Sequence, residues 1–235
     1  MPDDQKPVCL TTIHPCVVTS IDELLCRTRA RLESNRRWII GITGAPGAGK
    51  STLAQALIDD LGPQIAVDVP MDGFHLANAV LDDLGIHDRK GAPHTFDSFG
   101  YVAMMRRIRE QPDAAAQGRD LIVYAPQFHR EIEEPIAGAI PVDAAVPIVL
   151  TEGNYLLLDE PPWSELAGLI DEVWYCAPPE QKRLEWLIGR HESYGRSPDA
   201  ARAWALGTDQ LNADIVERTK DRADVIVEIA NGERE

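Results

Sequence analysis

The chain has 235 residues, of which 44% are hydrophobic and 26% are charged, and its formal net charge at pH 7 is −15. This length and apolar content can bury one large core, so we predict a single domain over residues 1–235, with an N-terminal leader and helix within residues 1–37. The acidic balance argues against a broad surface for a polyanion, and we expect no nucleic-acid partner. Since no apolar run reaches the roughly 18 residues of a membrane span and no signal-peptide pattern opens the chain, we expect a cytoplasmic protein without a membrane partner.

Strand and helix patterns alternate along the chain. Ser20 to Glu23 has the pattern of a capping box and predicts a helix to about residue 35. Continuous apolar runs predict buried strands over residues 38–43, 65–69, 121–124, 146–151, 172–176 and 224–229. Helical spacing predicts helices over residues 50–61, 98–110, 179–191, 198–206 and 209–220, the second of them capped by Asp97. This order is typical of an α/β protein with three layers, α/β/α, around a mostly parallel, doubly wound sheet.

Two segments, residues 85–97 and 126–141, lack periodicity and are rich in Pro, Gly, His and charge. We predict that both are long loops over the sheet, where substrate contacts are usually built.

The segment from Gly44 to Ser51 reads G-x-x-x-x-G-K-S and lies between the predicted strand 38–43 and the predicted helix 50–61. In this pattern the backbone N–H groups of a tight loop point at phosphate oxygens, the lysine adds a positive charge, and the hydroxyl can ligate Mg²⁺. The alternative, a glycine-rich turn without a ligand, is far rarer in this context. The pattern therefore predicts a P-loop NTPase whose nucleotide contacts are Gly44, Ala45, Pro46, Gly47, Ala48, Gly49, Lys50, Ser51 and Thr52.

Two acidic residues follow predicted strands at the edge where a parallel sheet places its ligands. Asp72, in Met71-Asp72-Gly73, could accept the proton of a substrate hydroxyl and orient it for attack. It could equally be an ordinary turn residue or a helix cap. Glu152 follows the strand 146–151, where an acid with Ser51 would hold Mg²⁺, or it simply marks the solvated end of that strand.

Arginines gather near the predicted helix 179–191. Seven-residue spacing puts Arg183 and Arg190 near one helical face, and Arg196 follows the potential hinge Gly195. A small helical lid at about residues 190–200 could bring Arg190 and Arg196 over a triphosphate as catalytic cations, together with Lys50. The alternative is a solvated face paired with neighbouring glutamates such as Glu180.

Further candidates for contacts to the acceptor lie in the two predicted loops and beside Asp72. Each is weak alone, because a single His or Arg in a loop is more often structural or solvated than a ligand. These candidates are His75, Arg89, Lys90, His129 and Arg130.

Several longer segments carry a family resemblance: VPMDGFHLAN at 69–78, RKGAPHTFD at 89–97, YAPQFHREIEEPIAGAIPV at 124–142, TEGNYLLLD at 151–159, RLEWLIGRHESYGRS at 183–197 and DQLNADIVERTKDRADVIV at 209–227. With them the chain resembles the superfamily of uridine kinases, phosphoribulokinases and bacterial pantothenate kinases. Within it, the chain looks closest to a group often labelled "putative fructose transport system kinase".

The resemblance implies that Asp72 activates the acceptor hydroxyl, that Glu152 lies near Mg²⁺, that Arg190 and Arg196 are lid arginines, and that residues 212–224 lie beside the adenine. We therefore expect a kinase that uses ATP and Mg²⁺ to phosphorylate a hydroxyl of a nucleoside, a sugar or a pantothenate-like metabolite, and we keep a homodimer open. The rival hypothesis is a P-loop ATPase that acts as a nucleotide-driven switch or assembly factor and has no metabolite acceptor.

Overall fold

The computed structural model describes residues 15–34 and 36–229. Its main sheet has six parallel strands in the order β1-β8-β7-β2-β6-β3. These strands are β1 (Cys16–Val18), β2 (Trp38–Thr43), β3 (Ala66–Asp68), β6 (Ile148–Glu152), β7 (Glu172–Cys176) and β8 (Val225–Val227). The α-helices are α1 (Ile21–Leu32), α2 (Lys50–Leu61), α3 (Asn78–Asp83), α4 (Ser98–Ala116), α5 (Glu180–Ser193), α6 (Pro198–Leu206) and α7 (Thr208–Glu217).

The predicted α/β class with a parallel, doubly wound sheet is confirmed. Five of the six predicted strands lie in this sheet, and the order of its strands changes direction around β2, as in other doubly wound sheets. The sheet has one further strand, β1, which the sequence analysis did not predict. At three residues β1 is too short for a periodic pattern, and it pairs with β8 at the edge of the sheet.

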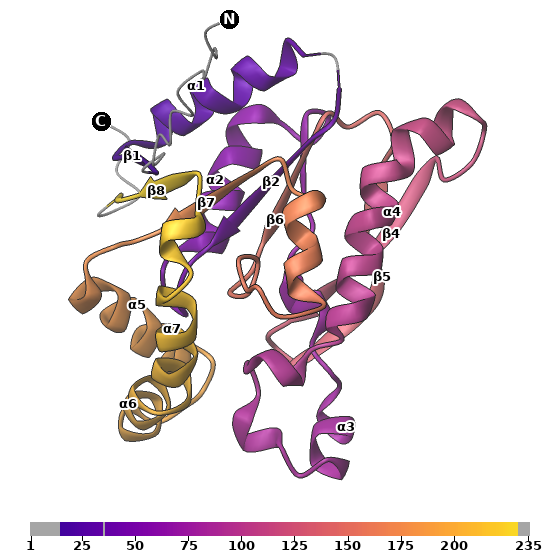
Figure 1. The fold of residues 1–235 in the computed structure, drawn as a ribbon. Coiled ribbons are helices and arrows are strands. Elements are labelled where there is room, and N and C mark those ends of the chain that lie inside the picture. Colours follow the sequence, from indigo (N-terminus) through magenta and orange to yellow (C-terminus); the bar gives the residue numbers. More distant parts are fainter. Residues whose placement is uncertain (1–14, 35, 230–235) are drawn as a thin grey trace, which may run out of the picture.

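Helices cover both faces of the sheet (Figure 1). On one face α1 and α2 bury residues such as Leu24 and Leu57 against β2 and β6. The predicted cap of α1 is present, because Ser20 accepts a hydrogen bond from the backbone N–H of Glu23. Residue 35, where that helix was expected to end, lies outside the described residues.

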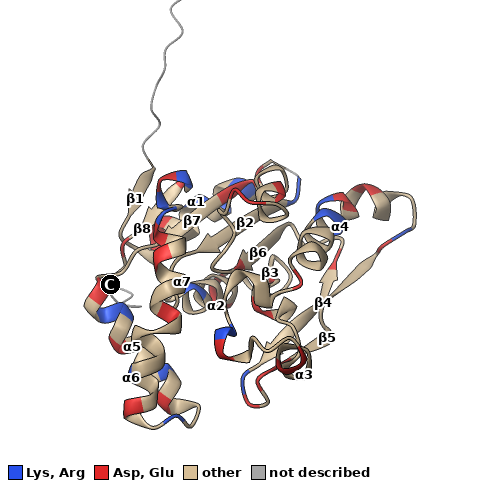
Figure 2. Cartoon of the chain, turned by 60° about the horizontal axis from the view of Figure 1, so that its bottom comes forward, with Lys and Arg blue, Asp and Glu red and all other residues tan. Residues whose placement is uncertain are grey.

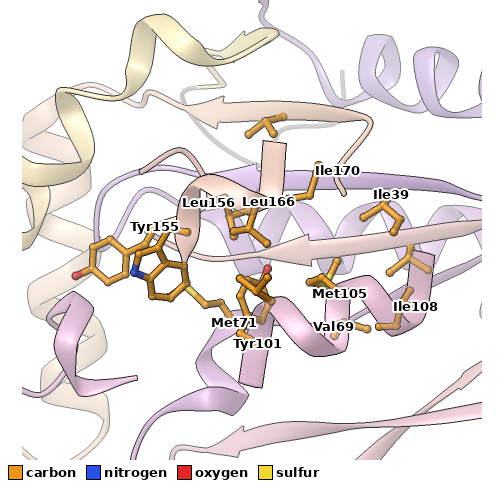
Figure 3. Close-up of a cluster of buried hydrophobic side chains, with 14 of the residues drawn as sticks. Ile39, Val69, Met71, Tyr101, Met105, Ile108, Tyr155, Leu156, Leu166 and Ile170 are labelled. Carbon is orange, nitrogen blue, oxygen red and sulfur yellow. The ribbon is translucent and has the colours of Figure 1, made fainter. Parts of the chain in front are cut away.

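The opposite face is covered by α4 and by the 3₁₀ helix η4 (Trp163–Gly168). Figure 3 shows this cluster, in which Met71, Tyr101 and Leu166 are fully buried. The predicted Asp97 cap accepts from the N–H of Gly100, and the helix runs six residues further than predicted. Full burial of a large apolar side chain is worth about 1.5–3 kcal/mol, so these packed faces stabilise the position of the strand ends that carry the site.

One predicted strand and one predicted loop are wrong. Residues 121–124 do not join the parallel sheet, and most of residues 126–141 is not loop. Instead β4 (Ile122–His129) and β5 (Glu134–Asp143) form a separate antiparallel hairpin with a register shift between Ala125 and Gln127. The physical reason is that prolines and glycine interrupt the alternation in the sequence, while Val123, Ala125 and Val142 still turn one face to the core.

The other predicted loop, residues 85–97, consists largely of turns and two single-turn 3₁₀ helices, η2 (His87–Arg89) and η3 (Pro93–Thr95).

In Figure 2 charged residues are spread over the helices, whereas the middle of the β4–β5 hairpin is free of Lys, Arg, Asp and Glu. None of the helices within residues 15–34 and 36–229 combines the length and apolar character needed to cross a membrane.

Candidate active site

The loop predicted to hold phosphate connects β2, at the centre of the sheet, to α2. Gly47 in this loop has φ of +82°, and a Cβ there would lie 2.8 Å from both the Arg183 carbonyl oxygen and the Leu187 Cβ of α5. The Lys50 ammonium group donates to the carbonyls of Gly44 (2.9 Å) and Ala45 (3.2 Å). Burial lowers the pKa of Lys50, although Glu152 and Asp72 favour its charged form. The loop is therefore folded around a buried amine that faces two acids.

Ser51 and Glu152 meet because their strands are neighbours. Glu152 ends β6, which pairs with β2 in a register that sets Glu152 opposite Ile42. The Ser51 hydroxyl donates to Glu152 Oε1 at 2.9 Å, and Glu152 is buried. Burial and the nearby Asp72 carboxylate raise the pKa of Glu152, so an added cation would be stabilised here.

Asp72 lies in the 3₁₀ helix η1 (Met71–Phe74), just after β3. A Cβ at Gly73 would overlap the carbonyl oxygen of Pro126, so only glycine allows η1 to pack this closely against β4. That contact brings Arg130, at the end of the hairpin strand, to 3.3 Å from Asp72 Oδ2.

Burial favours the neutral form of Asp72, but the surrounding cations outweigh it. His75, Arg130 and Lys50 hold the pKa of the Asp72 carboxyl below its ordinary value. The His75 ring Nδ1 lies 2.8 Å from the Asp72 backbone carbonyl, and its ring packs against Phe96 and Phe128 with centroid distances of 4.0 and 4.8 Å. The fold thus holds an ionised acid beside an aromatic wall.

A cavity of about 370 Å³ joins these groups. Its wall is formed by residues of the phosphate loop, the turn around Asp72, the tip of the hairpin and the helices α5 to α7. Its predicted site residues are Pro46, Lys50, Ser51, Asp72, His75, Lys90, Arg130, Glu152, Arg190 and Arg196. Two acids, three predicted phosphate-loop residues and most of the predicted acceptor contacts therefore share one space.

Two predicted acceptor contacts do not line this cavity. Arg89 and His129 are absent from its wall, so the structure gives no support to their predicted role. Lys90 lines it, but its ammonium group is 2.6 Å from both Asn78 Oδ1 and the Glu133 carbonyl. Lys90 therefore ties the segment after β3 to the hairpin as well as facing the cavity.

The three arginines near α5 differ in their contacts. Arg183 pairs with Glu180, as the alternative hypothesis expected, but it is buried rather than on a solvated face, and it donates to the carbonyl of Pro46 at 2.8 Å. The guanidinium group of Arg190 has no hydrogen-bond or ion-pair partner among residues 15–34 and 36–229, and burial, followed by repulsion from Arg130, lowers its pKa. Arg196, which follows Gly195, packs over the Trp204 ring at 4.2 Å.

Two side-chain contacts join helices α5 and α7: Arg183 donates to Gln210 Oε1 at 2.8 Å, and His191 meets Asp209 beside the cavity. His191 Nε2 lies 2.6 Å from Asp209 Oδ2, and both residues line the cavity. This pair, Asn154, Phe128 and Asn212 are wall residues that the sequence analysis did not select for acceptor binding. Phe128 and Asn212 stand in segments that carried the family resemblance, which was the available signal.

A second cavity of about 420 Å³ lies on the other side of the phosphate loop and is lined mainly by apolar atoms. Its wall consists of Ile21, Ala48, Gly49, Thr52, Leu53, Ala56, Cys176, Pro178, Trp186, Val227 and Ile229. No residue of the segment 212–224, which the resemblance placed beside adenine, lines it. The apolar patch comes from α1, α2, α5 and the ends of β7 and β8, which no single stretch of sequence reveals, and the expected place of the segment 212–224 beside adenine stays a prediction.

Comparison with known proteins gives consistent matches over most of the chain. The family model described as "Phosphoribulokinase / Uridine kinase family" matches residues 39–233. A Schizosaccharomyces pombe protein named "Putative uridine kinase C227.14" is 35% identical over 221 residues, which cover 90% of this chain and 91% of that protein. The Escherichia coli K12 protein YggC is 35% identical over 199 residues, covering 83% of this chain and 78% of YggC.

Among solved structures, a Silicibacter sp. TM1040 protein described as a "putative fructose transport system kinase" is 35% identical. It superposes with a TM-score of 0.77 over 89% of this chain and 99% of its own.

Proposed function

Since the chain belongs to the phosphoribulokinase and uridine kinase family, whose members here are kinases of small metabolites, we propose that it transfers the γ-phosphoryl group of ATP to a hydroxyl of a small metabolite. One observation carries the proposal. An ionised acid, Asp72, and the phosphate-loop amine of Lys50 face the same cavity of about 370 Å³. A kinase needs this pair, whereas a simple ATPase needs no acid that orients an alcohol.

The phosphates of ATP would bind at the loop 44–49 and at Lys50. Its base would lie in the second, apolar cavity, between Thr52 of α2, Pro178 after β7 and Trp186 of α5. The two cavities share the phosphate loop as their common wall, which suits a ligand with a polar middle and a flat apolar end. Arg183 donates a hydrogen bond to the carbonyl of Pro46 and would stabilise the loop without contacting the phosphates.

Mg²⁺ would be held by the Ser51 hydroxyl and the Glu152 carboxylate. Both are hard oxygen ligands. The negative charge of Asp72 contributes to the raised pKa of Glu152, so a cation bound at this end of the cavity would neutralise repulsion between the two acids. In the part of the chain that the structure describes, no three His, Cys, Asp or Glu side chains cluster as a metal site. That suits Mg²⁺, which usually takes one or two protein ligands and completes its shell with phosphates and water. When bound, Mg²⁺ would neutralise charge on the transferring phosphoryl group.

Asp72 would accept a hydrogen bond from the acceptor hydroxyl and aim its oxygen at the γ-phosphorus. As the new O–P bond forms, the bond from the γ-phosphorus to the bridging oxygen of ADP breaks, and the hydroxyl proton passes to Asp72. The low pKa of Asp72 makes it a weak base, so its main contribution is orientation, with the proton leaving late in a loose transition state. Arg130, 3.3 Å from Asp72, would fix the carboxylate in this direction.

Arg190 and Arg196 would supply positive charge to the triphosphate. Arg190 already lines the cavity without an anionic partner, and Arg196 would leave the Trp204 ring by rotation at Gly195. Residues 190–200 would then act as a lid that closes when ATP is bound.

The test is Asp72→Asn, measured with γ-labelled ATP and a set of small alcohols that includes nucleosides, sugars and pantothenate. We expect the wild type to label an acceptor and the variant to lose at least about 100-fold in turnover, because the orienting carboxylate is gone while the loop is intact. Binding of ATP should stay within about twofold of wild type. Asp113→Asn, at an exposed position of α4, is the matched control and should behave as wild type.

Two results would contradict the proposal. Near-normal turnover in Asp72→Asn would remove Asp72 from the reaction. Release of free phosphate alone, with every alcohol unlabelled, would favour the nucleotide-driven ATPase.

A further inference from the structure

Asn212 is a buried polar residue whose side chain has no hydrogen-bond partner in the part of the chain that the structure describes. It lies on α7, is 1% exposed and lines the cavity that contains Asp72. Its Oδ1 atom is buried and accepts no hydrogen bond, and its Nδ2 donates none to any residue within 15–34 and 36–229. An amide left this way costs about 1–3 kcal/mol for each unsatisfied polar atom. Most buried polar groups avoid this cost, so an exception in a cavity wall needs an explanation.

Two neighbours of Asn212, Asp209 and Gly91, are themselves held in place by hydrogen bonds. Asp209, one turn earlier on α7, is held by His191 of α5 at 2.6 Å. On the other side, Gly91 approaches so closely that a Cβ there would lie 3.6 Å from Asn212 Nδ2. The carbonyl of Gly91 is in turn held by the buried Tyr155 hydroxyl at 2.5 Å.

Two of the cationic groups that share this cavity with Asn212 already have partners. Lys90 is bonded to Asn78 and to the Glu133 carbonyl, and Arg130 lies 3.3 Å from Asp72. The rings of His75, Phe96 and Phe128 form an apolar surface nearby. Asn212 therefore offers an uncommitted donor and an uncommitted acceptor in the same cavity as Asp72.

We propose that Asn212 binds the phosphoryl acceptor at a second polar group, a hydroxyl or an amide, that donates and accepts hydrogen bonds at once. This inference rests on the proposed kinase function and narrows its substrate class. The acceptor then carries two polar groups: the hydroxyl that Asp72 orients, and a second group, held by Asn212, that sets the position of the first. Asn212 is a positioning and specificity residue, since it acts on the part of the acceptor that does not react.

The first test is Asn212→Leu, which keeps the shape of the side chain and removes both polar atoms. The probes are D-ribose, uridine, pantothenate and D-glycerate, each of which has a hydroxyl to phosphorylate and a second hydroxyl or amide. For the probe that the wild type phosphorylates best, we expect the KM to rise at least about tenfold, while the KM for ATP stays unchanged. The Tm should stay equal or rise, because an unsatisfied buried amide is replaced by an apolar group.

Asn78→Leu is the matched control, because both polar atoms of Asn78 are hydrogen-bonded, to Lys90 and to the Glu133 carbonyl. There the Tm should fall, as expected for a structural asparagine. A fall in Tm for Asn212→Leu with an unchanged acceptor KM would make Asn212 structural and overturn the inference.

A binding measurement keeps this inference separate from the proposed function. The Tm of wild type and of Asn212→Leu is measured with each probe in the absence of ATP. Stabilisation of the wild type alone supports the role of Asn212 even if no probe is phosphorylated, a result that would count only against the kinase. The inference is overturned if none of the four probes raises the Tm of the wild type and the wild type phosphorylates none of them.

Discussion

The two sides of the main cavity are built in different ways. The phosphate side is one continuous stretch, β2, the loop and α2, and β2 is paired on both sides by β6 and β7. The acceptor side is assembled from η1, the segment around Gly91, the hairpin tip and α7, which are far apart in the sequence. Phosphate binding therefore depends on local sequence and a rigid sheet, whereas the choice of acceptor depends on contacts that can change without disturbing the sheet.

The largest expected effect tests the phosphate side. Lys50→Ala removes the buried amine that faces Glu152 and Asp72, and we expect turnover to fall by at least about 10²- to 10³-fold with weaker binding of ATP. Labelled-product assays and calorimetric titration with ATP measure the two quantities. Arg106→Ala, which removes an exposed ion pair between α4 and Glu165, is the control. Unchanged ATP affinity in Lys50→Ala would contradict the assignment of ATP binding to the phosphate side of the cavity.

The next effect tests the acceptor side alone. Gly73→Ala places a methyl group on the Pro126 carbonyl, which must push η1 away from the hairpin and shift Asp72 from Arg130. We expect about 1–3 kcal/mol of lost stability and a large fall in turnover, with ATP affinity preserved. Urea unfolding and ATP titration check both parts. Gly189→Ala, on α5 where a Cβ meets no atom within 4 Å, is the control.

Loss of ATP binding in Gly73→Ala would mean that the two sides are mechanically coupled. The coupling would then run through η1, which follows β3 and contacts both the hairpin and the end of the sheet.

The smallest effect concerns pH. Burial lowers the pKa of His75, with the nearby Lys90 and Arg130 adding to the effect against the pull of Asp72. Between this lowered pKa and the ordinary value of about 6.5, the unfolded chain binds more protons than the folded one. The free energy of unfolding should therefore fall as the pH is lowered through about 6.5, by at most about 1.4 kcal/mol per pH unit from this one group.

Urea unfolding at pH 7.5, 6.5 and 5.5 measures that slope. His75→Phe keeps an aromatic ring against Phe96 and Phe128 and should flatten it. An identical slope in the variant would assign the pH dependence to other groups.

The same contrast explains how far the sequence could predict the structure. The phosphate loop, its strand and its helix were predictable because their signals are contiguous, and Glu152 followed from a plain apolar run. The β4–β5 hairpin was not, because Pro126, Pro135 and Gly138 mask its alternation and only packing on η1 shows its register.

Side-chain roles were predictable only where chemistry alone fixes them. Arg183 and Arg190 looked alike in the sequence. Arg183 donates to the Pro46 carbonyl, whereas the Arg190 guanidinium lines the cavity with no ion pair to any residue that the structure describes. Asn212 could not be selected at all, because being buried without a hydrogen bond is a property of the folded protein. Sequence patterns therefore could not predict which residues of the site select the acceptor.

Among the strands within residues 15–34 and 36–229, β1 pairs with β8 alone, and the N–H of Cys16 donates to the carbonyl of Asp224. Of these described strands, β1 leaves the ribosome first during synthesis, whereas its partner β8 is made last. It must wait, unpaired, until Val225 to Val227 have emerged, because contacts between distant parts of a chain form late. Completion of this sheet edge therefore waits for β8, and a nascent chain stalled before β8 would leave β1 without this partner.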